Sequence, residues 1–211
     1  MNKEKPILFS AEMVRLILSG DKTQTRRAVK IPSWTWDKHE DLKFENGELL
    51  AMSRKMGYRK PIAPPYAVGD VLWVRETYAT FEGAMGAGFI YKADSVHNPP
   101  VELCIPDRWK PAIHMTRKAA RIFLRVKSIR PERLQDISID DARAECDSSI
   151  FNHSKTIAQL TTGHVRTKNA YIADFAGLWD YLNAERGLGW SVNPWVWVVE
   201  FAIKSEEVQH G

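Results

Sequence analysis

The alternation of apolar and polar positions along the chain predicts several short strands. Residues 6–9, PILF, form a brief apolar run that is typical of a strand, and residues 195–203, WVWVVEFAI, form a longer one. Residues 119–129 alternate with a period of two, as expected of a strand with one buried face. Two further strands are expected over residues 68–79, after a turn at Gly69–Asp70, and over residues 88–94.

Helical spacing of apolar residues separates these strands at three places. Residues 11–19 carry one apolar face, with Ser10 as the N-cap and Gly20 as the left-handed residue that ends the helix. Ser138 begins a short helix, SIDDARAE, and a longer amphipathic helix is expected over residues 169–184. Many strands with few helices, without regular βαβ alternation, favour a small mixed or antiparallel barrel that helices flank.

Two polar segments interrupt this pattern and are expected to be loop-rich insertions, over about 31–66 and 147–168. The first contains four prolines and the residues Trp34 and Trp36, which are candidates for stacking on a base. A frayed tail is expected over 204–211. With 211 residues, of which 44% are hydrophobic, the chain fits one domain spanning 1–211.

Composition excludes several classes of protein. Lys and Arg number 30 against 26 Asp and Glu, which is too mild a bias for a protein that coats nucleic acid. Cys104 and Cys146 form no CxxC pair and the six His show no metal-ligand spacing, so we expect no disulfide framework and no metal site. We also expect no organic cofactor. No apolar run approaches the length of a membrane span, and no signal peptide is evident, so a cytoplasmic protein without a membrane partner is expected.

The stretch SGDKTQTRR, residues 19–27, concentrates the residues that carry chemistry. A phosphate-binding P-loop is excluded, because Asp21 separates Gly20 from Lys22 and the stretch leaves a helix instead of entering one. A cationic cluster for a nucleotide or phosphodiester remains possible, although such clusters are more often solvated surface. Its members are Lys22, Arg26, Arg27 and Lys30.

A catalytic interpretation of the same stretch also remains open. Thr25 supplies a hydroxyl as a nucleophile, and Lys22, three residues away, supplies an amine that can accept its proton. The neighbouring cations Arg26 and Arg27 would favour the uncharged amine that a base requires. A carboxylate would then have to orient the amine, and the residues alone do not single one out.

Five blocks of the chain resemble the ASCH-domain proteins, in the form often carried by phages and prophages. The blocks are KPILFSAEMVRLILSGDKTQTRR, VGDVLWVRETYA, WKPAIHMTRKAARIFLRV, RLQDISIDDARAE and NPWVWVVEF. The resemblance implies an α+β, PUA-like fold: a small β-barrel with flanking helices and a cleft suited to a nucleotide or RNA.

Small bacterial members of this superfamily are N4-acetylcytidine amidohydrolases, and their motif G-x-K-T-x-T-x-R is matched by Gly20, Lys22, Thr23, Thr25 and Arg27. The resemblance implies that Lys22 and Thr25 are catalytic, and it assigns the third catalytic role to Glu145 at the end of the short helix. The chain departs from the larger members at Cys146, where they commonly have Gly, and at Thr116, where they commonly have Pro.

Further candidates for substrate binding come from the stretch and from the other blocks. Glu76 is the main rival of Glu145, and with Arg75 it either lines the cleft or forms a structural ion pair. The candidate substrate-binding residues are Thr23, Arg26, Arg27, Arg75, Glu76, His114 and Arg117.

Three functions are consistent with these residues. The preferred one is an amidohydrolase that removes an acyl group from a modified pyrimidine nucleoside, with Thr25 as nucleophile, Lys22 as base and Glu145 fixing the amine. The alternatives are a non-catalytic RNA-binding module and a metal-independent ribonuclease. The expected partner is a modified nucleoside or RNA, and no obligate protein partner is expected.

Overall fold

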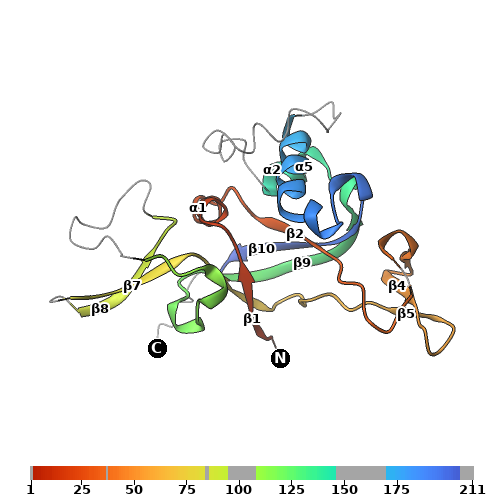
Figure 1. The fold of residues 1–211 in the computed structure, drawn as a ribbon, viewed down its shortest axis with the longest axis horizontal. Helices are drawn as coiled ribbons and strands as arrows, with labels where there is room; N and C mark the ends of the chain where they lie inside the picture. The colour runs from red at the N-terminus through yellow and green to blue at the C-terminus, as the bar shows by residue number, and fades with distance from the viewer. Residues whose placement is uncertain (1, 37, 84–85, 95–107, 146–169, 205–211) are drawn as a thin grey trace.

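The computed structural model describes residues 2–36, 38–83, 86–94, 108–145 and 170–204 (Figure 1). The expected insertion over 147–168 and residues 205–211 of the expected tail lie outside the described residues, as do Cys104 and Cys146.

The described elements are three α-helices and ten strands. The helices are α1 (Ala11–Ser19), α2 (Ile139–Glu145) and α5 (Ala170–Asn183). The strands are β1 (Glu4–Leu8), β2 (Gln24–Ala28), β3 (Lys43–Glu45), β4 (Glu48–Met52), β5 (Arg59–Pro61), β6 (Val71–Arg75), β7 (Tyr78–Gly83), β8 (Gly86–Tyr91), β9 (Phe123–Arg133) and β10 (Trp195–Ile203).

A five-stranded sheet in the order β1-β6-β9-β10-β2 forms the centre of the fold. Strand β1 runs parallel to β6, and the other pairs are antiparallel. Strand β10 is buried on both faces: Trp197, Val199 and Phe201 belong to the core that also contains α1, while Val196 and Val198 pack with α2 and α5. The helices therefore cover opposite faces of β10. Because both faces of this strand are buried, its sequence is a continuous apolar run.

The sheet does not close into a barrel in the described part of the chain. No ladder joins its terminal strands β1 and β2, so the fold is a mixed α+β arrangement with an open main sheet. The two edges nevertheless lie near each other, since the Arg27 guanidinium on β2 donates to the Leu8 carbonyl on β1 at 2.7 Å. One side chain thus spans a gap that backbone hydrogen bonds would bridge in a closed barrel.

Residues 31–66 contain more structure than the expected loop. Strands β3, β4 and β5 form an antiparallel sheet, and Leu49 and Ala51 of β4 are buried in the main core. The turn between β3 and β4 is Asn46–Gly47, both with positive φ, which is the most favourable two-residue sequence for a hairpin. The proline content concealed this signal at the sequence level.

The expected strand over 68–79 divides into two. Strand β6 ends at Arg75, and β7 begins at Tyr78 and pairs with β8 in a hairpin that projects from the main sheet (Figure 1). The capped helix α1, the short helix α2 and the final strand β10 are confirmed as predicted. Among the described residues, no helix has both the length and the apolar character that crossing a membrane requires.

Candidate functional site

The stretch over residues 19–27 runs from the end of α1 into β2, and contacts with three elements fix its path. Gly20 ends α1 with a φ of 86°, and the Lys22 amide then donates to the Leu16 carbonyl at 3.0 Å. The Thr23 amide donates to Ala144 of α2, and its carbonyl accepts from Phe201 of β10. The stretch therefore lies between α1, α2 and the main sheet.

Lys22 and Glu145, expected to act together, are in direct contact and almost fully buried. Their exposed fractions are 3% and 5%. The Lys22 ammonium lies 2.7 Å from the backbone oxygen of Glu145 and 3.5 Å from its carboxylate. The end of α2 thus offers the amine a carbonyl oxygen as well as a charge.

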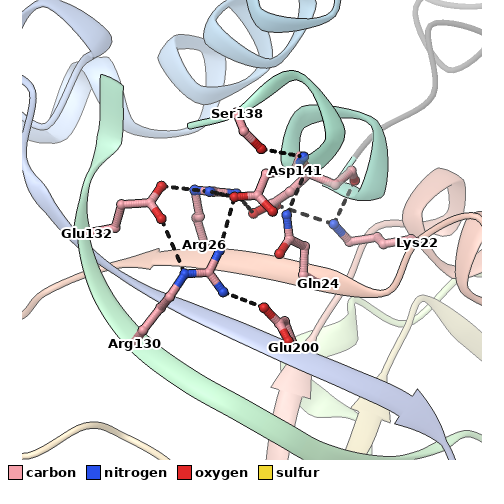
Figure 2. Close-up of polar contacts among 9 residues, drawn as sticks. Lys22, Gln24, Arg26, Arg130, Glu132, Ser138, Asp141 and Glu200 are labelled. Atoms are coloured by element: carbon pink, nitrogen blue, oxygen red, sulfur yellow. Dashed lines mark hydrogen bonds and ion pairs between the residues drawn. The ribbon is translucent and has the colours of Figure 1, made fainter. Parts of the chain in front are cut away.

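Arg26 holds the same carboxylate from another direction. Its side chain has no exposed surface, and it bonds to Glu145 at 2.9 Å, to Glu132 at 2.7 Å and to Asp141 at 2.9 Å (Figure 2). Burial acts to lower the pKa of Arg26, but the three carboxylates outweigh it and the pKa is raised. Arg26 is therefore a permanent cation that fixes three acidic side chains.

A second cation completes this network at its more exposed side (Figure 2). Arg130 bonds to Asp141 at 3.0 Å and to Glu132 at 3.4 Å, and it also contacts Glu200. Burial acts to raise the pKa of Asp141, but the hydrogen bonds and charges around it, chiefly from Arg26, lower it overall. Sequence reasoning did not select Arg130, Glu132 or Glu200. The strand predicted over 119–129 ended before Arg130, whereas β9 continues to Arg133 and carries Arg130 and Glu132 on one face.

The alternation of β2 divides the stretch between two environments. Gln24 and Arg26 face α2, where the Gln24 amide donates to the Asp141 backbone oxygen at 2.8 Å. Thr25 and Arg27 occupy the opposite face of the strand. The edge strand β2 was not predicted, because its sequence QTRRA contains no apolar alternation.

The Thr25 face also contains a shared aromatic ring. Thr25 is 5% exposed. The Phe9 ring lies 5.7 Å from the Lys22 ammonium and 5.4 Å from the Arg27 guanidinium carbon. Lys22 and Arg27 therefore share the Phe9 ring, and Thr25 lies on the same face of β2 as Arg27.

A cavity of about 380 Å³ opens beside Arg27, between β1, β2 and the segment that precedes β6. Arg27, Lys30, Tyr66 and Trp197 line it together with aliphatic side chains. Its volume is in the range of small-molecule sites.

Glu76 lies in a separate cluster. It is 1% exposed, and Arg121 holds both of its carboxylate oxygens, at 2.9 and 3.1 Å, while also pairing with Asp94. Burial raises the pKa of Glu76, and Arg121 opposes the shift. Of the two alternatives for Glu76, the structure shows an ion pair, with Arg121 as partner and not with Arg75.

The remaining candidates contact other parts of the molecule. The Arg75 guanidinium donates to the Ile113 carbonyl, and Arg117 forms an exposed ion pair with Glu4 at 2.8 Å. The side chains of Thr23 and His114 are exposed. Trp34 packs against the main core, whereas Trp36 is exposed.

The described residues contain no group of three acidic, His or Cys side chains that could hold a metal ion.

No protein-family model matches the chain, and no curated protein matches it. Among solved structures, the chain is similar to a DUF984-family protein from Enterococcus faecalis V583, with 10% identity, a TM-score of 0.40, and coverage of 96% of this chain and 80% of that one. It is also similar to an ASCH domain from Lactobacillus crispatus JV V101, with 12% identity, a TM-score of 0.39, and coverage of 95% and 79%. An ASCH domain is thus one of the solved structures that this chain resembles.

Proposed function

We propose that this protein is a hydrolase that removes an acyl group from the exocyclic amine of a modified pyrimidine nucleoside, with N4-acetylcytidine as the test substrate. The observation that carries the proposal is the buried contact between Lys22 and Glu145. Thr25, which is also buried, follows Lys22 by three residues. A buried amine paired with a carboxylate, in the same stretch as a buried threonine, supplies the residue types that covalent acyl transfer needs as base, orienting group and nucleophile.

The proposed reaction uses Thr25 as nucleophile. Its hydroxyl attacks the acyl carbonyl while Lys22, in its uncharged amine form, accepts the proton, which gives a tetrahedral intermediate. Lys22 then returns the proton to the departing N4 nitrogen as the C–N bond breaks, and water hydrolyses the acyl-threonine to acetate.

In this mechanism Glu145 orients the amine and Arg26 positions Glu145. Arg26 bonds to one carboxylate oxygen of Glu145, while the Lys22 ammonium lies nearer the other. Arg26 is fully buried, so its proposed role changes from substrate binding to positioning.

The test is release of cytidine and acetate from N4-acetylcytidine by the purified protein. Thr25→Val preserves the side-chain shape and removes the hydroxyl, so we expect turnover to fall by more than about 100-fold while the circular dichroism spectrum is unchanged. Lys22→Arg should be similarly poor, because a guanidinium does not release a proton at neutral pH. The matched control is Thr80→Val on the projecting hairpin, which should retain full activity.

A fully active Thr25→Val variant would remove the nucleophile assignment. Salt-dependent RNA binding without turnover would instead indicate a non-catalytic RNA-binding module. RNA cleavage in the presence of a chelator would indicate a metal-independent ribonuclease.

A further inference from the structure

Arg27 is a half-buried cation that forms no ion pair within the described residues. Its guanidinium donates to the neutral carbonyl of Leu8 and lies over the Phe9 ring, and its Nε is buried without a hydrogen-bond partner. The neighbouring Arg26, in contrast, contacts three carboxylates. A half-buried charge with a buried, unpartnered Nε and no anion of its own is less well solvated than a charge on the surface, so an anion from outside the chain would be favoured here.

The cavity beside Arg27 has the charge and the walls that such an anion needs. Arg27 and Lys30 are its cations, and none of the described residues that line it is acidic. Tyr66, Trp197 and aliphatic side chains of β1 form the rest of the lining. The lining therefore suits a compact anion attached to an uncharged organic group.

The distance between Arg27 and Thr25 sets the length that a ligand needs in order to reach both residues. The two residues lie on the same face of β2, two positions apart, which is about 6.6 Å along a strand. A nucleotide is long enough to place its exocyclic amide near Thr25 and its phosphate beyond Arg27.

We propose that the cavity is an anion subsite that takes the phosphate of a mononucleotide. The choice of a nucleotide rests on the proposed function, whereas the anion rests on Arg27 and the cavity alone. A phosphate would give the half-buried Arg27 a charge-assisted hydrogen bond, and a nucleoside without phosphate would leave the cation unpaired. The preferred substrate is then an acylated nucleoside monophosphate and not the free nucleoside.

Isothermal titration calorimetry with cytidine 5′-monophosphate, cytidine and inorganic phosphate tests this subsite without requiring turnover. We expect the monophosphate to bind at least about tenfold tighter than cytidine, and inorganic phosphate to bind more weakly than the monophosphate. Arg27→Met should remove the preference and leave the affinity for cytidine unchanged, and Arg27→Lys should retain part of it. Lys43→Met, which removes an exposed cation outside the cavity, should retain the full preference.

Equal affinities of the wild-type protein for cytidine and its monophosphate would overturn the subsite, as would a preference that survives in a folded Arg27→Met protein. Inorganic phosphate binding as tightly as the monophosphate would overturn the nucleotide assignment. If the monophosphate is preferred but its N4-acetyl derivative is not hydrolysed, the proposed function fails and the subsite stands. If hydrolysis occurs with equal kcat/KM on nucleoside and monophosphate, the function stands and the subsite fails.

Discussion

Arg26 and Arg27 are adjacent in the sequence but differ in their burial and in the charge of the groups that they contact. Arg26 is neutralised by Glu132, Asp141 and Glu145, whereas Arg27 meets a neutral carbonyl and an aromatic ring. The alternation of a single strand separates them. At the scale of residues, one arginine therefore assembles the site and the other remains available to a ligand.

Substitution of Arg26 tests its positioning role. Lys at this position retains the charge but cannot reach three carboxylates, so we expect kcat on N4-acetylcytidine to fall by about tenfold with little change in KM. Arg26→Met removes the buried cation and leaves the three carboxylates with only Lys22 and Arg130 as partners, so it should reduce the free energy of unfolding by about 3–5 kcal/mol. Arg117→Met, which breaks an exposed pair, should change it by less than about 1 kcal/mol in the same urea titration. An unchanged kcat in Arg26→Lys would contradict the role.

Glu76 provides a comparison within one ion-pair cluster. Glu76→Ala leaves the half-buried Arg121 with one exposed partner, so we expect a loss of about 3 kcal/mol in unfolding free energy. Asp94→Ala removes the more exposed carboxylate of the same arginine and should cost less than about 1 kcal/mol. Equal losses, measured by urea denaturation, would show that burial does not decide the contribution of these pairs.

At the scale of elements, helix α1 directs the chain into the site. Ser10 caps its first turn by accepting from the Met13 amide, and Gly20 ends it in the left-handed conformation. No atom lies within 4 Å of the position that a Cβ of residue 20 would take. The requirement for glycine is therefore conformational and not steric.

Gly20→Ala should destabilise the protein by about 1–2 kcal/mol, because a β-carbon disfavours the left-handed region. Gly20→Asn should cost less, since Asn tolerates this conformation better than other residues with side chains. Thermal denaturation of both variants measures the difference. Equal melting temperatures for the two variants would contradict the conformational explanation.

The elements that were predicted correctly are those whose sequence signals lie within or next to the element. The prediction missed elements and contacts that depend on residues far away in the sequence. Helix α1 has its capping residues directly beside it and an apolar face within it, and strand β10 is a continuous apolar run. Strand β2 is polar, and the partners of Arg26 lie 106 to 119 residues away along the chain, beyond the reach of any periodicity. Lys22 and Thr25 were candidates from the stretch itself and the family resemblance strengthened them, whereas Glu145 was selected by the resemblance alone, since no pattern in the residues singled out one carboxylate.

At the scale of the whole molecule, Asp70 fastens the N-terminal strand to the main sheet. Its carboxylate accepts from the Lys3 and Ala67 amides at 2.9 and 3.0 Å and pairs with Lys5 at 3.1 Å. These hydrogen bonds, the Lys3 amide first among them, lower the pKa of Asp70 to about 2. One side chain therefore joins β1 to the turn that precedes β6.

This shift makes part of the stability dependent on pH. Because the pKa of Asp70 is lower in the folded state, its contribution is present above the ordinary pKa of an aspartate and is lost as the pH falls towards 2. Asp70→Asn should reduce the free energy of unfolding by about 1–2 kcal/mol at pH 7. The difference from wild type should shrink below about pH 4 in urea titrations, and a constant difference would exclude the linkage.

The contacts of Arg26 also have a consequence for biosynthesis and folding. Residues 22–26 leave the ribosome before Glu132, Asp141 and Glu145, which are translated more than 100 residues later. Pairing them requires closure of a long loop, which slows folding relative to local contacts. A nascent chain that has not reached residue 132 exposes the cations of the stretch to water, so a peptide that contains only this motif should lack both structure and activity.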